Sequence, residues 1–150
     1  MEIKPLQSEE EYLQCLQIAK DLREWFNEGG IKAIERDLKS EATFIAHENE
    51  VIGFIILKPI NDRALEILWM AVKREHQGKG IGSSLLSFVE EWARGKGFEV
   101  LLVKTSGDLN YKPYDRTRRF YEKGGFVRIA LIDPYPEWGE EALIYVKCLK

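Results

Sequence analysis

A short glycine-rich segment is the first feature of the sequence that could hold a ligand. Residues Gln77 to Gly82 read QGKGIG and connect an apolar stretch, 65–72, to a run of residues with helical spacing. Glycines let the backbone approach a ligand closely and adopt conformations that other residues resist. The unpaired N–H groups at the start of the following helix point at the turn, and the helix dipole favours an anion there. The segment therefore predicts a phosphate or pyrophosphate site.

The spacing within the segment excludes two common phosphate-binding motifs. A P-loop needs GxxxxGK followed by Ser or Thr, but here Lys79 precedes Gly80 and the upstream glycine is absent. A dinucleotide fingerprint needs a third glycine where Ser83 stands, and it belongs to the first strand of a βαβ unit. The structural alternative is a loop that is rich in glycine only because it turns tightly.

One carboxylate lies inside the apolar stretch that precedes this segment. Glu66 belongs to LEILWMAV, and strict strand alternation would place it on the same face as Leu68, Met70 and Val72. Desolvation among such neighbours would make the carboxylate a stronger base. Glu66 is therefore a candidate general base. The alternative is a solvated glutamate at the start of a strand, since exposure is the norm for this residue type.

The remaining pattern predicts the helices and strands that position these residues. A capping box at Ser8 and Glu11 begins a helix that is expected to end at Gly29–Gly30, and a shorter helix is expected at 31–38. The later elements are expected in the order strand 42–47, strand 51–57, strand 65–72, helix 81–93, strand 100–103, helix 115–123, strand 126–132 and strand 142–148. Because a strand, a helix and a strand in succession imply a parallel pair, the fold class is α+β or mixed α/β with a mostly antiparallel sheet.

Composition and charge limit the classes of function. Of the 150 residues, 45% are hydrophobic and 31% are charged, and no repeat or linker divides them, so residues 1–150 are expected to form one domain. A net charge of -3 without a basic stripe argues against nucleic acid as a partner. The two cysteines lie far apart and the two histidines are unpaired, so no metal site is expected. No apolar run suits a signal peptide or a membrane span, which makes the cytoplasm the expected location.

Two motifs in the correct order resemble those of the GNAT family of N-acetyltransferases. VKREHQGKGIGSSLL, from Val72 to Leu86, is similar to the acyl-CoA-binding signature of that family, whose defined positions are filled by Gln77, Gly80 and Gly82. FYEKGGF, from Phe120 to Phe126, is similar to the C-terminal motif. The resemblance implies a twisted, mostly antiparallel sheet of about six to seven strands with about four helices. It also implies that the fourth and fifth strands run parallel and splay apart.

The resemblance also implies a cofactor and the residues that hold it. Acetyl-CoA would act as co-substrate, with its pantetheine arm in the gap between strands 65–72 and 100–103. Backbone groups of Met70, Ala71 and Val72 would bond the arm, and Lys79 or Arg74 could neutralise phosphate charge. The pyrophosphate would be held by backbone amides of the loop and the first helical turn, with contacts from Gln77, Gly78, Lys79, Gly80, Gly82 and Ser83.

The implied activity is transfer of an acetyl group to a primary amine of a small molecule or peptide by direct attack in a ternary complex. Tyr121 resembles the tyrosine that protonates the departing thiolate, since a phenol has a suitable donor and pKa. Glu66 matches the catalytic glutamate of histone-acetylating members. A backbone N–H of Met70 or Val72 would meet the oxyanion. The alternative function is a non-catalytic acyl-CoA-binding regulatory module on the same fold.

The acceptor is expected where the first two helices, the 106–113 loop and the 133–141 loop converge. These segments carry the aromatic residues Trp25, Phe26, Tyr111, Tyr135 and Trp138 and the acidic residues Asp108, Glu137, Glu140 and Glu141. Such a mixture would suit a cationic amine through cation–π and charge contacts. It would equally suit a protein surface or the contact of a homodimer.

Overall fold

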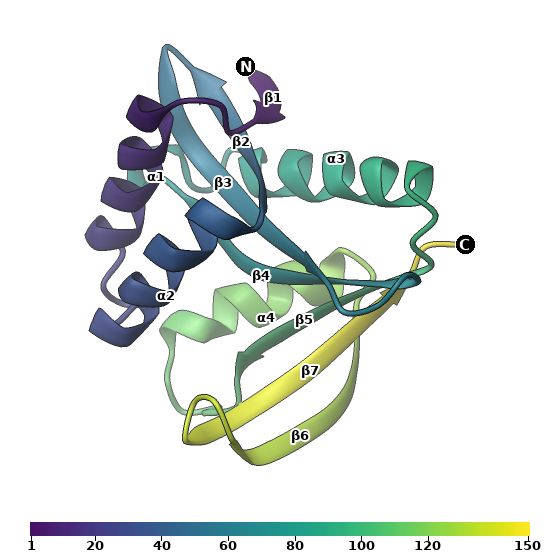
Figure 1. The fold of residues 1–150 in the computed structure, drawn as a ribbon. Helices are drawn as coiled ribbons and strands as arrows, with labels where there is room; N and C mark the ends of the chain where they lie inside the picture. The colour runs from purple at the N-terminus through teal and green to yellow at the C-terminus, as the bar shows by residue number, and fades with distance from the viewer.

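The seven strands form one sheet, and the computed structural model describes all 150 residues (Figure 1). The strand order is β1-β2-β3-β4-β5-β7-β6, and only the β4–β5 pair is parallel. The elements in chain order are β1 (Glu2–Pro5), α1 (Glu9–Asp21), α2 (Glu28–Ser40), β2 (Ala42–Glu48), β3 (Glu50–Pro59), β4 (Ala64–Val72), a 3-10 turn (Arg74–His76), α3 (Ile81–Gly95), β5 (Val100–Ser106), α4 (Pro113–Lys123), β6 (Val127–Tyr135) and β7 (Glu140–Cys148). The predicted mixed, mostly antiparallel sheet with four helices is confirmed.

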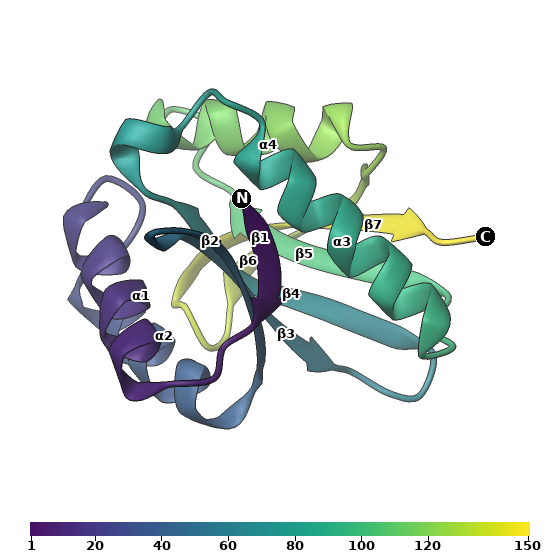
Figure 2. The ribbon, with the colours of Figure 1, turned by 90° about the horizontal axis from the view of Figure 1, so that it is seen from above.

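Helices cover both faces of the sheet, which gives the molecule two apolar cores (Figure 2). One core lies between the sheet and helices α1 and α2, and it contains Ile34, Phe54 and Ile56. The other lies between the sheet and helices α3 and α4, and it contains Leu85 and Tyr121. We refer to these two sides as the α1/α2 face and the α3/α4 face. None of the helices is both long enough and apolar enough to cross a bilayer.

The N-terminal helices differ from the sequence expectation at one boundary. Ser8 caps α1 as predicted, because its hydroxyl accepts the N–H of Glu11 at 3.1 Å. The helix ends at Asp21 rather than at Gly29–Gly30. Those two glycines lie in the first turn of α2, where the side chain of Asn27 accepts the N–H of Gly30 at 2.8 Å. The expectation was wrong because an asparagine cap starts a helix more strongly than two glycines stop one.

The parallel pair β4–β5 separates after four residues, as the family resemblance implied. Pairing runs from Ala64 with Val100 to Ile67 with Val103 and then stops. At the same point β4 carries a bulge, because Ile67 and Trp69 pair with adjacent residues of β3 and leave Leu68 unpaired. The second half of β4 therefore borders a gap that β5 does not fill.

Candidate active site

The first turn of α3 presents a run of backbone donors without acceptors. The N–H groups of residues 78–83 bond to no group of the protein, whereas Gln77 and Ser84 on either side are bonded. The N-cap of α3 is Gly80, which has no side chain to cap with, and the first turn contains no acidic residue. Helices α1 and α2, in contrast, are capped by Ser8 and Asn27. Six free N–H groups at a positive helix end form a site that favours an anion.

Two different physical reasons explain why this loop requires glycine. Gly78 and Gly80 have φ angles of 77° and 84°, in the left-handed region that side chains resist. A Cβ at either position would meet nothing within 4 Å, so the conformation, rather than crowding, requires glycine. At Gly82 the reason is crowding, because a Cβ there would lie 3.3 Å from the ring of Phe120 on α4. The loop is thus open to solvent on its donor side and packed on its helix side.

The unpaired half of β4 offers backbone groups to the gap at alternate residues. The N–H of Lys73 bonds to the carbonyl of Ile52 at 2.8 Å, which fixes the phase of the antiparallel ladder with β3. The alternation of that ladder turns the backbone groups of Ala71 toward β3 and those of Met70 and Val72 toward the gap. Of the three contacts that the resemblance implied, Ala71 is therefore already engaged by β3. Only Met70 and Val72 have backbone groups that face the splay.

The side chains around the loop make different contacts from those that the sequence predicted. The amide of Gln77 donates to the carbonyl of Val72 at 2.9 Å and so ties the loop to the end of β4. Arg74 is not free to meet a phosphate, because its guanidinium holds Glu24 at 2.7 Å and lowers the pKa of that carboxyl to about 2. Lys79 is exposed and forms no ion pair, so it is the remaining cation at this loop.

Glu66 does not lie among the apolar neighbours that alternation predicted. The bulge at Leu68 shifts the alternation, so Met70 and Val72 pack on the α3/α4 face while Glu66 and Leu68 face the other side. There the carboxylate of Glu66 pairs with the ammonium of Lys104 at 3.1 Å, with 13% of its side chain exposed.

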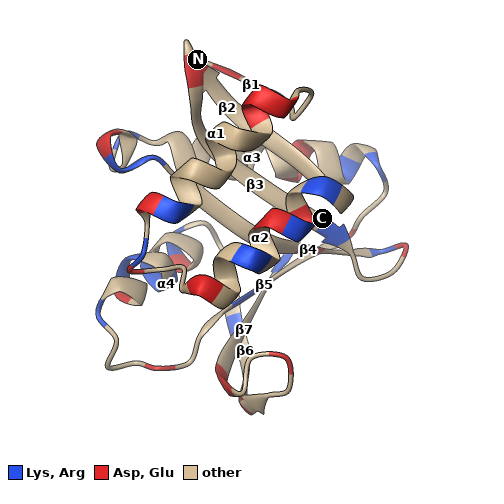
Figure 3. Ribbon diagram, turned by 60° about the vertical axis from the view of Figure 1, so that its left-hand side comes forward, with Lys and Arg blue, Asp and Glu red and all other residues tan.

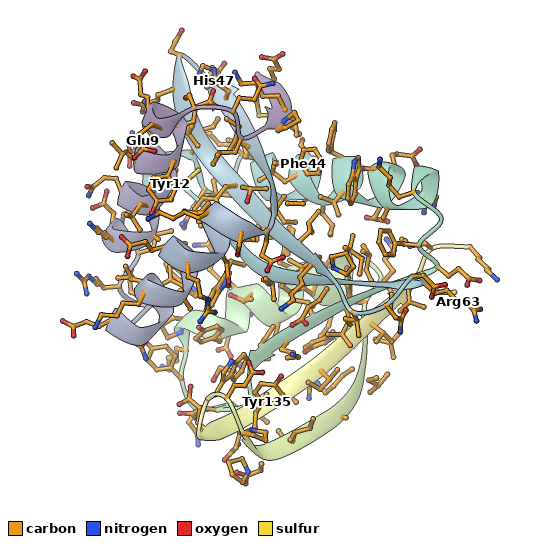
Figure 4. All side chains as sticks on the ribbon, in the orientation of Figure 1. Glu9, Tyr12, Phe44, His47, Arg63 and Tyr135 are labelled. Carbon is orange, nitrogen blue, oxygen red and sulfur yellow. The ribbon has the colours of Figure 1, made fainter.

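Lys104 links this carboxylate to the tip of the β6–β7 hairpin. Its ammonium donates to the Tyr135 hydroxyl at 2.6 Å and lies 4.6 Å from the centroid of the same ring. Tyr135 is the last residue of β6, and its side chain lies close to β5 (Figure 4). Burial alone would lower the pKa of Lys104, but the bonds to Tyr135 and Glu66 outweigh it and raise that pKa. Sequence analysis missed Lys104, because a single lysine in a strand carries no local signal of its partner.

Tyr121 lies on the opposite face of the sheet from Glu66. It is 4% exposed and makes edge contacts with the rings of Phe120 and Phe126. No hydrogen bond ties its hydroxyl to another group of the protein, and burial raises its pKa, so the phenol stays a neutral donor at ordinary pH. Because the acid candidate and the base candidate lie on opposite faces, a reacting group could reach both only at the gap between β4 and β5.

A buried hydroxyl at the gap also lacks a partner. Thr105 is 3% exposed, and its Oγ1 bonds to no other group of the protein. The residue lies in the part of β5 that has left β4, beyond the last pair at Val103. A buried hydroxyl without a hydrogen-bond partner is energetically costly. Sequence reasoning could not single out this residue, because threonine is common in strands.

The segments expected to form the acceptor site do converge. The indole of Trp25 donates to the carbonyl of Pro113 at 3.0 Å, and the Tyr111 hydroxyl donates to the carbonyl of Glu24 at 2.6 Å. The connection between α1 and α2 is therefore fastened to the loop before α4. Phe26 is 7% exposed and belongs to the α1/α2 core, so it is not available to an acceptor.

The β6–β7 hairpin brings acidic side chains to the rim of this region. Glu137, Glu140 and Glu141 follow each other closely in the sequence there, and Figure 3 shows acidic positions in red at the tip of the hairpin. Burial, reinforced by the negative charge of Glu140, raises the pKa of the Tyr114 phenol to about 12. Trp138, 38% exposed, lies against Tyr135 with 5.3 Å between ring centroids. The rim thus combines negative charge with aromatic surface.

Comparison with known proteins relates both the sequence and the fold to one family. A family model described as the acetyltransferase (GNAT) family matches residues 3–126. The uncharacterized N-acetyltransferase YsnE of Bacillus subtilis is 29% identical over 93 residues, which are 62% of this chain and 58% of that relative. The match therefore spans less than two thirds of the relative's own length.

Two solved structures share the fold over nearly the whole chain. A putative acetyltransferase of the GNAT family from Desulfovibrio desulfuricans aligns with a TM-score of 0.87 at 20% identity, covering 99% of both chains. An aminoglycoside 6′-N-acetyltransferase complexed with coenzyme A aligns with a TM-score of 0.79 at 18% identity, covering 100% of this chain and 98% of the other. With its family-model match over most of its length, the chain belongs to the GNAT family of acetyltransferases.

Proposed function

We propose that this protein transfers an acetyl group from acetyl-CoA to a primary amine. The observation that carries the proposal is the run of six free N–H groups at residues 78–83, placed beside the open gap between β4 and β5. An anion-binding helix end next to a gap lined by backbone groups suits a ligand with a pyrophosphate and an extended amide-bearing arm. The structural relative complexed with coenzyme A supports this assignment.

The residues present fit such a ligand. The N–H groups of residues 78–83 would receive the pyrophosphate, and the exposed Lys79 would meet remaining negative charge. Gap-facing backbone groups of Met70 and Val72 would bond the arm. When bound, acetyl-CoA would supply the acyl group and a thiolate that leaves.

Two side chains would move the protons that the transfer needs. On the α1/α2 face, the Glu66 carboxylate would take a proton from the ammonium form of the acceptor, directly or through water. Lys104 would hold that carboxylate in place, and an incoming ammonium would compete for the same oxygens. On the α3/α4 face, the Tyr121 hydroxyl would donate its proton to the leaving sulfur. Base and acid would then work from opposite sides of one reacting centre.

The acceptor would enter from the side of the acidic hairpin. Glu137, Glu140 and Glu141 would attract a cation, and the exposed ring of Trp138 offers a cation–π surface. These features favour an amine that is protonated in solution, whether it belongs to a small molecule or to a peptide.

A thiol-release assay with acetyl-CoA and a panel of amines tests the proposal. The panel would contain amino acids, polyamines, aminoglycosides and basic peptides, and calorimetry would measure acetyl-CoA binding in parallel. We expect binding together with turnover of at least one amine. Tight binding without turnover of any amine would instead favour a non-catalytic acyl-CoA-binding module. Absence of binding would refute the ligand assignment itself.

A further inference from the structure

Three hydrogen bonds join the connection between α1 and α2 to the segment that begins α4. The indole of Trp25 donates to the carbonyl of Pro113 at 3.0 Å, and the Tyr114 hydroxyl donates to the carbonyl of Trp25 at 2.8 Å. The Tyr111 hydroxyl donates to the carbonyl of Glu24 at 2.6 Å. The two segments therefore form one hydrogen-bonded unit. We call it the bridge, and it consists of residues 22–27 and 111–114.

The bridge connects elements that lie on opposite faces of the sheet. Helices α1 and α2 cover one face, and α4 covers the other. Paired strands would separate the two segments, but the pairing of β4 with β5 has already ended at Ile67 and Val103. Figures 1 and 2 both place the α1–α2 connection beside the start of α4. The bridge therefore closes the open end of the gap between β4 and β5.

Contacts with β4 place the bridge beside the proposed reacting centre. The ring of Phe26 packs edge-on against that of Trp69, with 5.9 Å between the centroids. The indole N–H of Trp69 donates to Asp37 of α2 at 2.9 Å. Trp69 lies in the half of β4 that has no β5 partner, three residues after Glu66 and on the same face. The α1–α2 connection thus forms a wall of the gap on the face that carries the candidate base.

The guanidinium of Arg74 holds this wall from the 3-10 turn after β4. It donates to both carboxylate oxygens of Glu24, at 2.7 and 2.8 Å, and to the carbonyl of Asp21 at 2.8 Å. Most ion pairs on a protein surface contribute little, but a bidentate arginine pair within a network has a defined geometry. Glu24 belongs to such a network, because its carboxylate binds Arg74 while its carbonyl accepts the Tyr111 hydroxyl.

We propose that Arg74 is a positioning residue for the acceptor amine rather than a contact for the phosphates of acetyl-CoA. Both of its terminal nitrogens are directed at Glu24, although the residue directly precedes the anion-binding loop. It keeps the wall in place before an amine arrives, which spares the amine the entropy of ordering it. The kinetic consequence rests on the proposed acetyl transfer, whereas the hold of Arg74 on the bridge does not.

Steady-state kinetics and calorimetry of Arg74→Ala distinguish the two roles. We expect the KM for the acceptor amine to rise at least about 10-fold while kcat changes less than about threefold. The Kd for acetyl-CoA should stay within about twofold of the wild-type value. Arg63→Ala is the matched control, because Arg63 also pairs with a glutamate, Glu99, whose pKa is likewise lowered to about 2. That pair lies outside the bridge, so the control should change neither constant.

Exchange of the two charges tests the pair itself. Glu24→Arg should raise the acceptor KM as Arg74→Ala does, because two cations would then face each other. Adding Arg74→Glu to that variant should return the KM to within about threefold of the wild-type value. Failure of the double variant to recover would show that the Arg74–Glu24 pair is not what positions the wall.

Hydrogen exchange measures the hold on the bridge without any substrate. The N–H of Phe26 bonds to the carbonyl of Leu22 at 3.0 Å, and the N–H of Tyr114 bonds to that of Tyr111 at 3.2 Å. Peptides with these amides should exchange at least about 10-fold faster in Arg74→Ala than in the wild type or in Arg63→Ala.

Two results would overturn the proposal. One is unchanged exchange in Arg74→Ala, which would show that the bridge does not depend on this residue. The other is weaker binding of acetyl-CoA with an unchanged acceptor KM, which would make Arg74 a phosphate contact. A wild type that binds no acetyl-CoA would refute the proposed function instead, and hydrogen exchange would still decide whether Arg74 holds the bridge.

Discussion

Replacement of Tyr121 by phenylalanine distinguishes a catalytic role of its hydroxyl from a role of its ring in core packing. The ring makes edge contacts with Phe120 and Phe126 that phenylalanine would keep. The hydroxyl has no hydrogen-bond partner in the protein, so its removal breaks no bond. We therefore expect the free energy of unfolding to change by less than about 1 kcal/mol, with the variant at least as stable as the wild type. Acetyl-CoA affinity should also stay similar, because the hydroxyl acts only as charge develops on sulfur.

The effect should appear in the rate of the chemical step. Loss of a general acid typically costs about 10²–10⁴-fold, and a water molecule that substitutes would reduce that loss. We therefore expect a loss of about 10²–10³-fold. This corresponds to about 2.7–4 kcal/mol of transition-state stabilisation. Since burial raises the pKa of the phenol, the loss should not vary with pH across the neutral range.

Single-turnover kinetics is the appropriate assay, since product release could hide the effect in steady-state rates. Tyr12→Phe is a matched control. Tyr12 is 7% exposed, its hydroxyl is also buried without a partner, and it lies on α1, away from the gap (Figure 4). The control should keep the wild-type rate. If Tyr121→Phe also keeps it, or if both variants lose activity equally, Tyr121 packs the core and the acid must be sought elsewhere.

Three further predictions concern the ligand loop, the base and the gap. Gly80→Val should raise the Kd for acetyl-CoA at least about 10-fold, as measured by calorimetry. Gly97→Val is the control, since Gly97 has a similarly positive φ of 89° but follows the far end of α3, and it should leave this Kd unchanged. Glu66→Gln should lower kcat/KM by about 10²–10⁴-fold. This loss should shrink as the pH rises, because more of the acceptor amine is then already neutral. A loss that stays constant over a pH series would indicate that Glu66 positions the acceptor instead of accepting its proton. Thr105→Val should keep or raise the Tm, because it removes a buried hydroxyl that has no partner, and a clear fall of the Tm in a thermal melt would contradict this expectation.

Sequence alone predicted those parts of the fold that depend on neighbouring residues. The cap at Ser8, the strong helical spacing of α3 and the glycine-rich loop before it are local patterns, and each appears where it was expected. The order of strands and helices followed from the same patterns and led to the mixed sheet. Strand β1 was missed because four residues give too little periodicity to recognise.

Local sequence patterns could not identify the contacts of several residues in the candidate site. Alternation predicted the neighbours of Glu66 correctly only as far as the bulge at Leu68, and a bulge has no reliable signature in one strand. The partner of Glu66, Lys104, comes from a strand 38 positions further along the chain and meets it only through the parallel register. The same register leaves the hydroxyl of Thr105 without a partner.

The sequence by itself therefore determined where donors, acids and bases could occur, since residue type and local conformation decide that. Only the tertiary structure decided which of them meet. Separation of β4 from β5 after Ile67 opens the gap, and the phase of the β3–β4 ladder turns the backbone groups of Met70 and Val72 toward it. Glu66 and Tyr121 lie on opposite faces of the sheet, since Glu66 points away from the core that contains Tyr121. The strand order leaves β6 as an uncovered apolar edge. These relations depend on pairing between distant segments, whose register is set by the packing of the whole sheet rather than by any short stretch of it.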